Sequence, residues 1–198
     1  MIQLHVHSQY SPTESPASLR ELVLRAKYLN HTALALTDSN GVYGAINFIK
    51  LCHKYNIKPI IGSEITVSDY RLVILAKNKL GLMALYRILS LVHQNAAFDA
   101  IALEIKQNMD RLIQFTDDKA LFTKLQKLAP KSTYFELSKG FFNQDTLTWI
   151  HIHGIRTIAT CRIRVLDAKD YFYTDLLRAI KNNTTVNRLN KNTLFNEY

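Results

Sequence analysis

The chain has 198 residues, of which 47% are hydrophobic and 21% are charged. This composition excludes an intrinsically disordered protein and fits one domain with a sizeable core. No apolar run approaches the roughly 20 residues that a membrane-spanning helix needs, so no membrane is expected among its partners. The net charge of +9 is compatible with a nucleic-acid partner, but the basic residues are scattered and fit a solvated surface equally well.

Apolar runs alternate with amphipathic helical patterns along the chain. Buried strands are expected at Ile2–Val6, Thr32–Thr37, Ile57–Val67, Tyr70–Lys77, Arg111–Thr116, Thr133–Ser138 and Arg156–Thr160. Helices are expected at Ser18–Asn30, with Ser15 or Ser18 as the N-cap, around Ala45–Cys52 and Leu85–Val92, and near residues 118–128, 143–153 and 167–181.

This alternation predicts an α/β fold in which crossover helices join the strands of a parallel sheet. About seven such units suit a closed, TIM-like (β/α) barrel better than two separate domains. Residues 1–198 are therefore taken as one domain. The polar stretch at 182–198 is expected to lead onward into a longer protein, of which this chain is a fragment.

Three segments place candidate ligands at the carboxyl ends of predicted strands, where barrel enzymes carry their chemistry. His5 and His7 end the first strand, and residues two apart on a strand face the same side, so both imidazoles can reach one metal ion. Asp38 ends the second strand and Glu64 ends the third. These side chains are expected to meet at one face of the barrel.

Two blocks near the start are distinctive, LHVHSQYS and ALALTDSNGVYGAINFIKLCHKYNIKPIIGSEITV. Further blocks follow in order: RLVILAKNKLGLMALYRILSLVHQN, TYFEL, HGIRTIAT and LLRAIKNNTT. Together they resemble the N-terminal PHP (polymerase and histidinol phosphatase) domain of C-family bacterial DNA polymerases, the DNA polymerase III alpha subunits. The resemblance covers essentially the whole chain and is densest over residues 1–95.

The resemblance implies a distorted (β/α)7 barrel that binds up to three metal ions in its intact members. Those members hydrolyse phosphoesters, which in the polymerases is a 3′–5′ exonuclease activity. Clustered metals suit this chemistry because they polarise a phosphoryl oxygen and generate hydroxide from water. The parent protein would be a DNA-directed DNA polymerase, a nucleotidyltransferase of DNA replication.

The resemblance also marks individual ligand positions. Positions that keep a ligand are His5 and His7, which match the first pair, Glu64, which matches a bridging glutamate, and Glu14, which stands near a family aspartate. Positions where a ligand is replaced are Ser39, Arg71, Arg162 and Arg164. A further ligand position falls near Gly140, and the one after the strand ending near Thr116 has no evident equivalent.

Arginine is a permanent cation with hydrogen-bond donors only, so it is not a metal ligand. Its repulsion of a nearby metal ion amounts to several kcal/mol at an effective dielectric of about 20. We therefore predict a degenerate site without catalytic residues, which holds no cofactor or at most one weakly bound Zn²⁺, Mn²⁺ or Mg²⁺. Instead, Arg162 or Arg164 is expected to pair with Glu64, with Asp38 as a further partner. Phosphate binding by the same arginines is an alternative.

The expected function is that of a structural or interaction module without catalysis. Its partners would be the remainder of the polymerase alpha subunit, DNA and other replisome subunits. Cys52 and Cys161 match no disulfide or metal spacing, which is typical of reduced thiols in a cytoplasmic protein. Two alternatives stay open. One is an active metal-dependent phosphoesterase, either a proofreading 3′–5′ exonuclease or a small-molecule phosphatase. The other is a free-standing nucleic-acid-binding domain.

Overall fold

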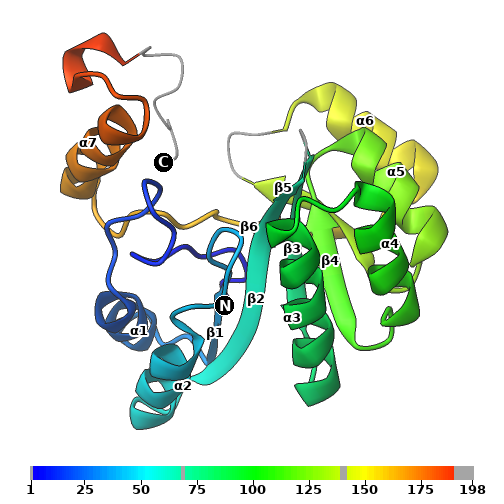
Figure 1. Cartoon of the computed structure of the whole chain (residues 1–198), viewed down its shortest axis with the longest axis horizontal. Coiled ribbons are helices and arrows are strands. Elements are labelled where there is room, and N and C mark those ends of the chain that lie inside the picture. The colour runs from blue at the N-terminus through cyan, green and yellow to red at the C-terminus, as the bar shows by residue number, and fades with distance from the viewer. Residues whose placement is uncertain (1, 68–69, 139–141, 190–198) are drawn as a thin grey trace.

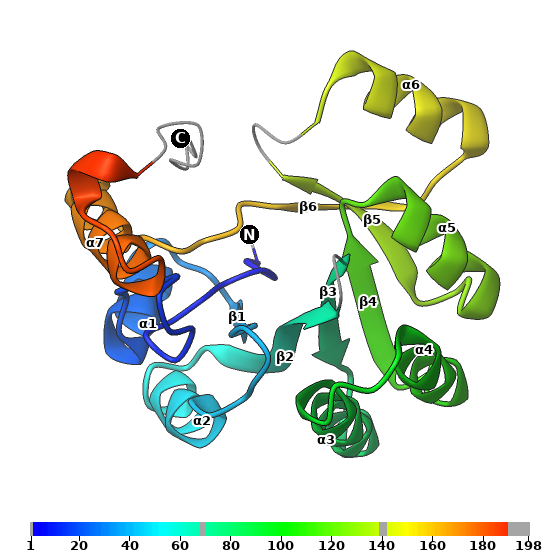
Figure 2. The same ribbon diagram turned by 45° about the horizontal axis from the view of Figure 1, so that its top comes forward.

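The strands form one curled sheet, and most of the helices lie along its outer side (Figures 1 and 2). The computed structural model describes residues 2–67, 70–138 and 142–189. The strands are β1 (Ala33–Leu36), β2 (Lys58–Val67), β3 (Tyr70–Ala76), β4 (Leu112–Thr116), β5 (Thr133–Ser138) and β6 (Thr157–Thr160). The helices are α1 (Leu19–Tyr28), α2 (Ala45–Lys54), α3 (Lys79–His93), α4 (Phe98–Gln107), α5 (Lys119–Leu128), α6 (Gln144–His153) and α7 (Tyr171–Lys181), with 3-10 turns at Ala168–Asp170 and Val186–Arg188.

Neighbouring strands in the sheet follow their order along the chain, from β1 to β6. The pairs β1–β2, β4–β5 and β5–β6 are parallel, whereas β3 runs antiparallel to both β2 and β4. The expectation of a wholly parallel sheet is therefore wrong at β3. A parallel connection needs a crossover of about a dozen residues or more, and only residues 68–69 separate β2 from β3.

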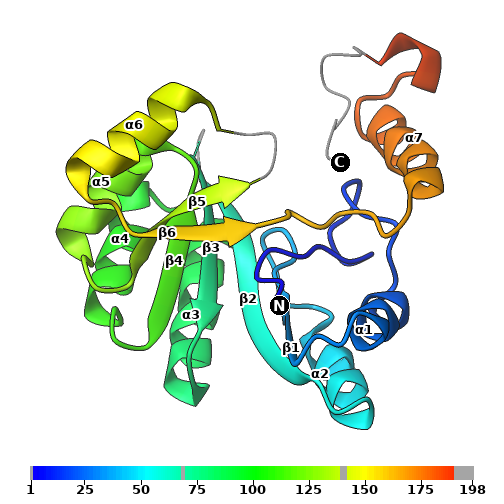
Figure 3. The same ribbon diagram turned by 180° about the vertical axis from the view of Figure 1, so that it is seen from behind.

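The N-terminal segment closes the sheet into a barrel. Gln3 forms a parallel bridge with Leu34 of β1, and Val6 forms one with Ile163 beyond β6. Figure 3 shows the chain leaving β6 and passing this segment on its way to α7. The strand expected at Ile2–Val6 is reduced to isolated bridges, but it still supplies the seventh member of the ring. The distorted barrel expected from the sequence is confirmed.

The helix boundaries follow local capping chemistry. Ser18, rather than Ser15, caps α1, and its side chain forms a reciprocal capping box with Glu21. Helix α4, which begins after Ala97 without a side-chain cap, has no counterpart among the elements expected from the sequence. The helix expected at 167–181 begins at Tyr171, after a 3-10 turn. Within the described ranges, no helix is both long enough and apolar enough to cross a membrane.

Two apolar clusters hold the wall of the barrel. One packs α1 and α2 against β1 and includes Val23, Leu36 and Phe48, none of them more than 2% exposed. The other packs α3, α4 and α5 against β3 and β4 around Ile74 and Leu85, which are fully buried. Each such side chain contributes roughly 1.5–3 kcal/mol to stability. Apolar burial therefore holds the wall, whereas the buried groups at the barrel mouth are charged.

Candidate functional site

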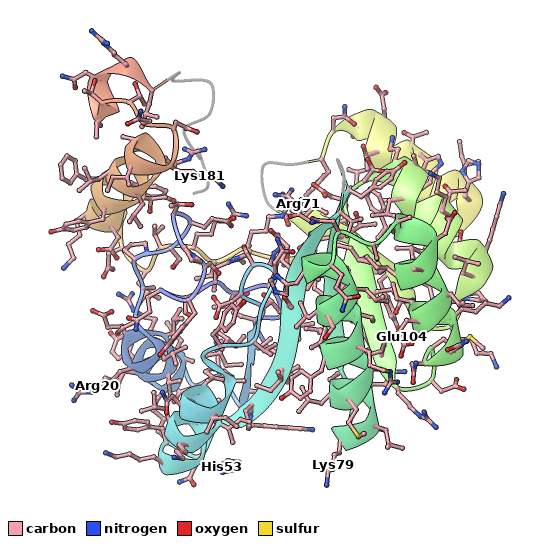
Figure 4. The ribbon with its side chains drawn as sticks, viewed as in Figure 1. Arg20, His53, Arg71, Lys79, Glu104 and Lys181 are labelled. Atoms are coloured by element: carbon pink, nitrogen blue, oxygen red, sulfur yellow. The ribbon has the colours of Figure 1, made fainter. Side chains whose placement is uncertain are left out.

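Charged side chains are buried at one end of the barrel, where the N-terminal segment, β2, β5 and the chain beyond β6 meet. They are His5, His7, Asp38, Glu64, Glu136, Arg162 and Arg164, and none is more than 8% exposed. Figure 4 shows Arg71 at this end, and His53 and Lys79 at the opposite end. Burying charges is unfavourable unless they are paired, so the contacts among them decide what the site can do.

His5 is hydrogen-bonded to a carboxylate at each ring nitrogen. Its Nδ1 lies 2.7 Å from Glu136 Oε1, and its Nε2 lies 2.8 Å from Glu64 Oε2. Burial lowers the pKa of His5, but the hydrogen bonds and negative charges of Glu136 and Glu64 outweigh burial and raise this pKa above its ordinary value. The structure therefore favours an imidazolium clamped between two carboxylates.

The two carboxylates that face His5 are held in their ionised form. Burial raises the pKa of Glu64, but hydrogen bonds from His5 and His7 outweigh burial and bring this pKa well below its usual range. Burial likewise raises the pKa of Glu136, but hydrogen bonds from His5 and Thr160 and the charge of Arg162 lower it to about 2. Both groups are therefore full negative charges at neutral pH.

His7 faces serine hydroxyls at one ring nitrogen and the side chains of His5 and Glu64 at the other. Its Nδ1 lies 3.0 Å from Ser11 Oγ and 3.4 Å from Ser39 Oγ. Burial lowers the pKa of His7, and nearby positive charge adds to the lowering. The neutral imidazole is therefore the stable form here, in contrast to His5.

Asp38 is stabilised by hydroxyl and amide donors. Its Oδ1 accepts hydrogen bonds from the Ser8 amide and from Ser11 Oγ, both at 2.6 Å, and its Oδ2 accepts one from Ser8 Oγ at 2.9 Å. The expectation of an arginine partner for Asp38 is not met, because these short bonds satisfy the carboxylate within the loop that follows the N-terminal segment. Asp38 thus holds this loop in place.

Arg162 has the largest fully buried side chain among the described residues. One of its terminal nitrogens lies 2.7 Å from Asp117 Oδ2 and 3.2 Å from Glu136 Oε2. Its backbone φ is +44°, in the left-handed region that non-glycine residues seldom adopt. Such a conformation costs about 1–3 kcal/mol and persists where surrounding contacts hold it. Arg162 therefore pairs with Glu136 and Asp117, not with Glu64.

Glu136 and Asp117 are absent from the site residues expected from the sequence. Glu136 lies inside the apolar block Thr133–Ser138, and a carboxylate in a buried strand needs a partner. This need for a partner was the signal in the sequence that could have identified Glu136 as a site residue. Asp117 directly follows Thr116 at the end of β4, and nothing in the sequence marks it as different from other exposed loop acids.

Two more arginines surround Glu64. A terminal nitrogen of Arg164 lies 3.7 Å from Glu64 Oε1 and 3.4 Å from Glu14 Oε2. Arg71 Nε lies 3.8 Å from Glu64 Oε2, and its terminal nitrogen lies 3.5 Å from Asp117 Oδ2. The structure therefore brings Arg164 to Glu64, as the ion-pair hypothesis requires, and brings Glu14 into the same cluster.

Positive and negative groups in this cluster are equal in number. The carboxylates are those of Glu14, Glu64, Asp117 and Glu136, and the cations are the guanidinium groups of Arg71, Arg162 and Arg164 and the imidazolium of His5. Each carboxylate has a cation within 3.4 Å. Within this set of eight groups every negative charge is offset by a positive one, whereas Asp38, buried at the same end, lies outside the set and depends on the Ser8 and Ser11 donors.

Among known families, the sequence matches the PHP domain over residues 3–125, which is more than half of the chain. The chain belongs to the PHP domain family. Among curated proteins, it is similar to the DNA polymerase III subunit alpha of Treponema pallidum, with 34% identity over 131 residues, 59% of this chain and 11% of that protein. It is also similar to the subunit of the same name from Chlamydia pneumoniae, with 27% identity over 210 residues, 93% of this chain and 17% of that protein. The resemblance seen in the sequence blocks is confirmed.

These relatives are far longer than the chain, which spans 11% and 17% of their lengths. Among solved structures, the PHP domain resembles a two-domain protein from Bacteroides vulgatus that contains a predicted PHP-like metal-dependent phosphoesterase. The TM-score is 0.56 and the identity 15%, over 87% of this chain and 54% of that one. At this identity, the likeness supports the fold alone.

Three of the expected ligand residues lie close enough together to hold a single ion. The ligand atoms of His5, His7 and Glu64 lie within 4.8 Å of one another. The two Nε2 atoms are 3.2 Å apart, and Glu64 Oε2 lies 2.8 Å from that of His5 and 3.7 Å from that of His7. Tetrahedral ligands about 2.1 Å from a zinc ion are separated by roughly 3.4 Å, which lies close to two of these separations, whereas His5 and Glu64 stand at hydrogen-bond distance and would have to move apart. Arg162 and Arg164 offer only donors, so the residues fit one ion and not a metal cluster.

The other ligand positions of the PHP family add little to that trio. Ser39 presents a hydroxyl, a poor ligand for these metals. Arg71 is engaged with two carboxylates. The position near Gly140 lies outside the described residues. The position after β4 has Asp117, whose carboxylate is occupied by arginines.

The stability of the PHP domain should fall as the pH drops. The folded pKa of Glu136 is about 2 against an ordinary 4.5, so its contribution, on the order of 3 kcal/mol, is present above pH 4.5 and lost as the pH falls towards 2. The lowered pKa of His7 adds to the loss below pH 6.5, whereas the raised pKa of His5 opposes it. Urea unfolding of the wild type and Glu136→Gln between pH 6 and pH 3 measures this. The gap between the two should narrow with falling pH, and parallel profiles would contradict the assignment.

Proposed function

We propose that this chain is the PHP domain of a DNA polymerase III alpha subunit and serves there as a structural module without nuclease activity. Its curated relatives carry that name, and the chain covers only a small share of their length, which supports a place within a larger polymerase. The remainder of the alpha subunit is the first partner. DNA and other replisome subunits follow, in cytoplasmic DNA replication.

One observation carries the loss of activity in this proposal. The guanidinium of Arg162 is buried between Glu136 and Asp117, at a position where the family resemblance expects a metal ligand. A metal ion in that place would lower the pKa of a bound water to about 7 and supply hydroxide. A guanidinium has no site for water coordination and only neutralises its carboxylates. The cluster is thus suited to holding the barrel mouth together.

A second candidate function is that of an active metal-dependent phosphoesterase, either a 3′–5′ exonuclease or a small-molecule phosphatase. It is favoured by the geometry of His5, His7 and Glu64, which suits one ion. Glu136 stands behind His5 Nδ1 at 2.7 Å, the arrangement in which a carboxylate orients a metal-bound histidine. Against it stand Arg71 and Arg164, whose charges both lie beside Glu64.

An exonuclease assay, repeated with a chromogenic phosphomonoester as substrate, separates the two functions. The purified chain is incubated with a labelled single-stranded oligonucleotide in Mn²⁺ and in Zn²⁺, alongside His7→Ala and His53→Ala. His53 is the matched control because it is an exposed histidine at the opposite end of the barrel. We expect no cleavage above buffer for any of the three. Metal-dependent cleavage that His7→Ala abolishes and His53→Ala retains would establish the phosphoesterase instead.

A further inference from the structure

A polar pocket opens beside the arginine cluster, between the N-terminal loop and the end of α7. Its volume is about 250 Å³, and its lining includes Thr13, Glu14, Arg164, Arg178, Lys181 and Asn182. Drug-sized ligands occupy roughly 300–1,000 Å³, so this pocket suits a small ion or a single chemical group. Figure 4 shows Lys181 at the same end of the molecule as Arg71.

The lining of this pocket carries more positive than negative charge. Arg164 lies 3.4 Å from Glu14 and 3.7 Å from Glu64, and Arg178 lies 3.7 Å from Asp175, so both arginines share their charge with carboxylates. Lys181 is exposed, and no carboxylate among residues 2–67, 70–138 and 142–189 forms an ion pair with it. The pocket therefore keeps a positive potential at its rim.

The lining is also rich in hydrogen-bond donors. Guanidinium, ammonium, amide and hydroxyl groups converge from three separate segments: the loop at Thr13, the chain at Arg164 and the last turn of α7. Basic residues in a last helical turn are common because they complement the helix dipole, which accounts for Arg178 and Lys181 alone. It does not explain why Arg164 and Thr13 line the same hollow.

We propose that this pocket binds a phosphate group. A phosphate offers several acceptor oxygens and a double negative charge, which match a pocket of mixed arginine and lysine donors. The group belongs either to a free nucleotide or to the backbone of a single strand, since both present the same oxygens. The proposal rests on the proposed function, because Arg164 stays in the pocket only while no metal ion takes its place beside Glu64.

The test is an NMR titration of the isotope-labelled chain at constant ionic strength with EDTA present. Inorganic phosphate is the first probe, followed by dAMP and a short single-stranded oligonucleotide. We expect phosphate to shift the amides of Thr13 and Asn182. Lys181→Gln should weaken its binding about tenfold, as expected for one lost charge-assisted hydrogen bond. Lys79→Gln, which removes the same charge at the opposite end of the barrel, should leave the affinity unchanged.

Two results would overturn the proposal that this pocket binds phosphate. One is the absence of shifts at Thr13 and Asn182, and the other is an equal loss of affinity in Lys181→Gln and Lys79→Gln. Phosphate binding that appears only after Zn²⁺ replaces EDTA, with shifts at His5 and His7, would instead overturn the proposed function. Tighter binding of dAMP than of the oligonucleotide assigns the pocket to a free nucleotide, and the reverse order assigns it to a strand.

Discussion

Replacing Arg162 by Met is expected to lower the free energy of unfolding by about 3–5 kcal/mol, the range for removing one partner of a buried ion pair. The guanidinium is 1% exposed and lies 2.7 Å from Asp117 and 3.2 Å from Glu136. Met keeps most of the side-chain length but removes the positive charge beside Glu136 and Asp117. Urea unfolding at pH 7 measures the loss, and Arg162→Lys, which keeps the charge but loses the fork, should recover part of it.

Arg87→Met is the matched control for this measurement. Arg87 forms a shorter ion pair, 2.6 Å from Glu104, but its side chain is 52% exposed. Exposed pairs contribute roughly 0–1 kcal/mol because solvent screens them. If Arg162→Met changes stability no more than Arg87→Met does, the buried cluster is not what holds the barrel mouth together.

Restoring ligands at the substituted positions is expected to restore metal binding. In the triple variant Ser39→His, Arg162→Asp and Arg164→His, three ligands replace a hydroxyl and two cations. Repulsion between a guanidinium and a nearby divalent ion amounts to several kcal/mol at an effective dielectric of about 20, and about 1.4 kcal/mol is a factor of ten. We therefore expect affinity for Zn²⁺ or Mn²⁺ to rise at least about a hundredfold, measured by calorimetry.

A charge-matched control shows whether new ligands or lost cations cause that rise. The double variant Arg162→Asn and Arg164→Gln removes the same two cations without adding carboxylate or imidazole ligands. We expect it to bind metal between the wild type and the triple variant. A triple variant with unchanged affinity would mean that these positions do not surround the His5, His7 and Glu64 trio.

The barrel could be predicted from the sequence because its strands are short apolar runs between amphipathic helices. The ends of β5 follow from residue chemistry alone, and the cap of α1 was narrowed to Ser15 or Ser18, of which the structure selects Ser18. The reversal of β3 could not be read from its apolar pattern, since parallel and antiparallel strands bury similar residues. Its signal was the connection itself, which is too short for a crossover helix.

Some residues of the candidate site could be predicted from the sequence, and others could not. His5, His7 and Glu64 could be placed at one end of the barrel because each ends a predicted strand, and Arg164 was placed there by the family resemblance. The pairing of Arg162 with Glu136 depends on a backbone φ of +44° at Arg162, and an arginine in the sequence does not predict such a conformation. The serine donors around Asp38 depend on the path of a loop. Contacts that depend on loop paths or on unusual dihedral angles cannot be predicted from the pattern of residue types along the sequence.

The central claim is that arginine side chains stand where metal ions would otherwise bind. The most direct test is a count of the metal ions bound to the native chain. The protein is purified without chelator, dialysed against Zn²⁺ and Mn²⁺ in turn, and analysed by inductively coupled plasma mass spectrometry. Because Glu14, Glu64, Asp117 and Glu136 are already paired with cations, and His5, His7 and Glu64 are the ligands that converge among the described residues, we predict no more than one ion per chain. Two or more tightly held ions per chain would contradict this account.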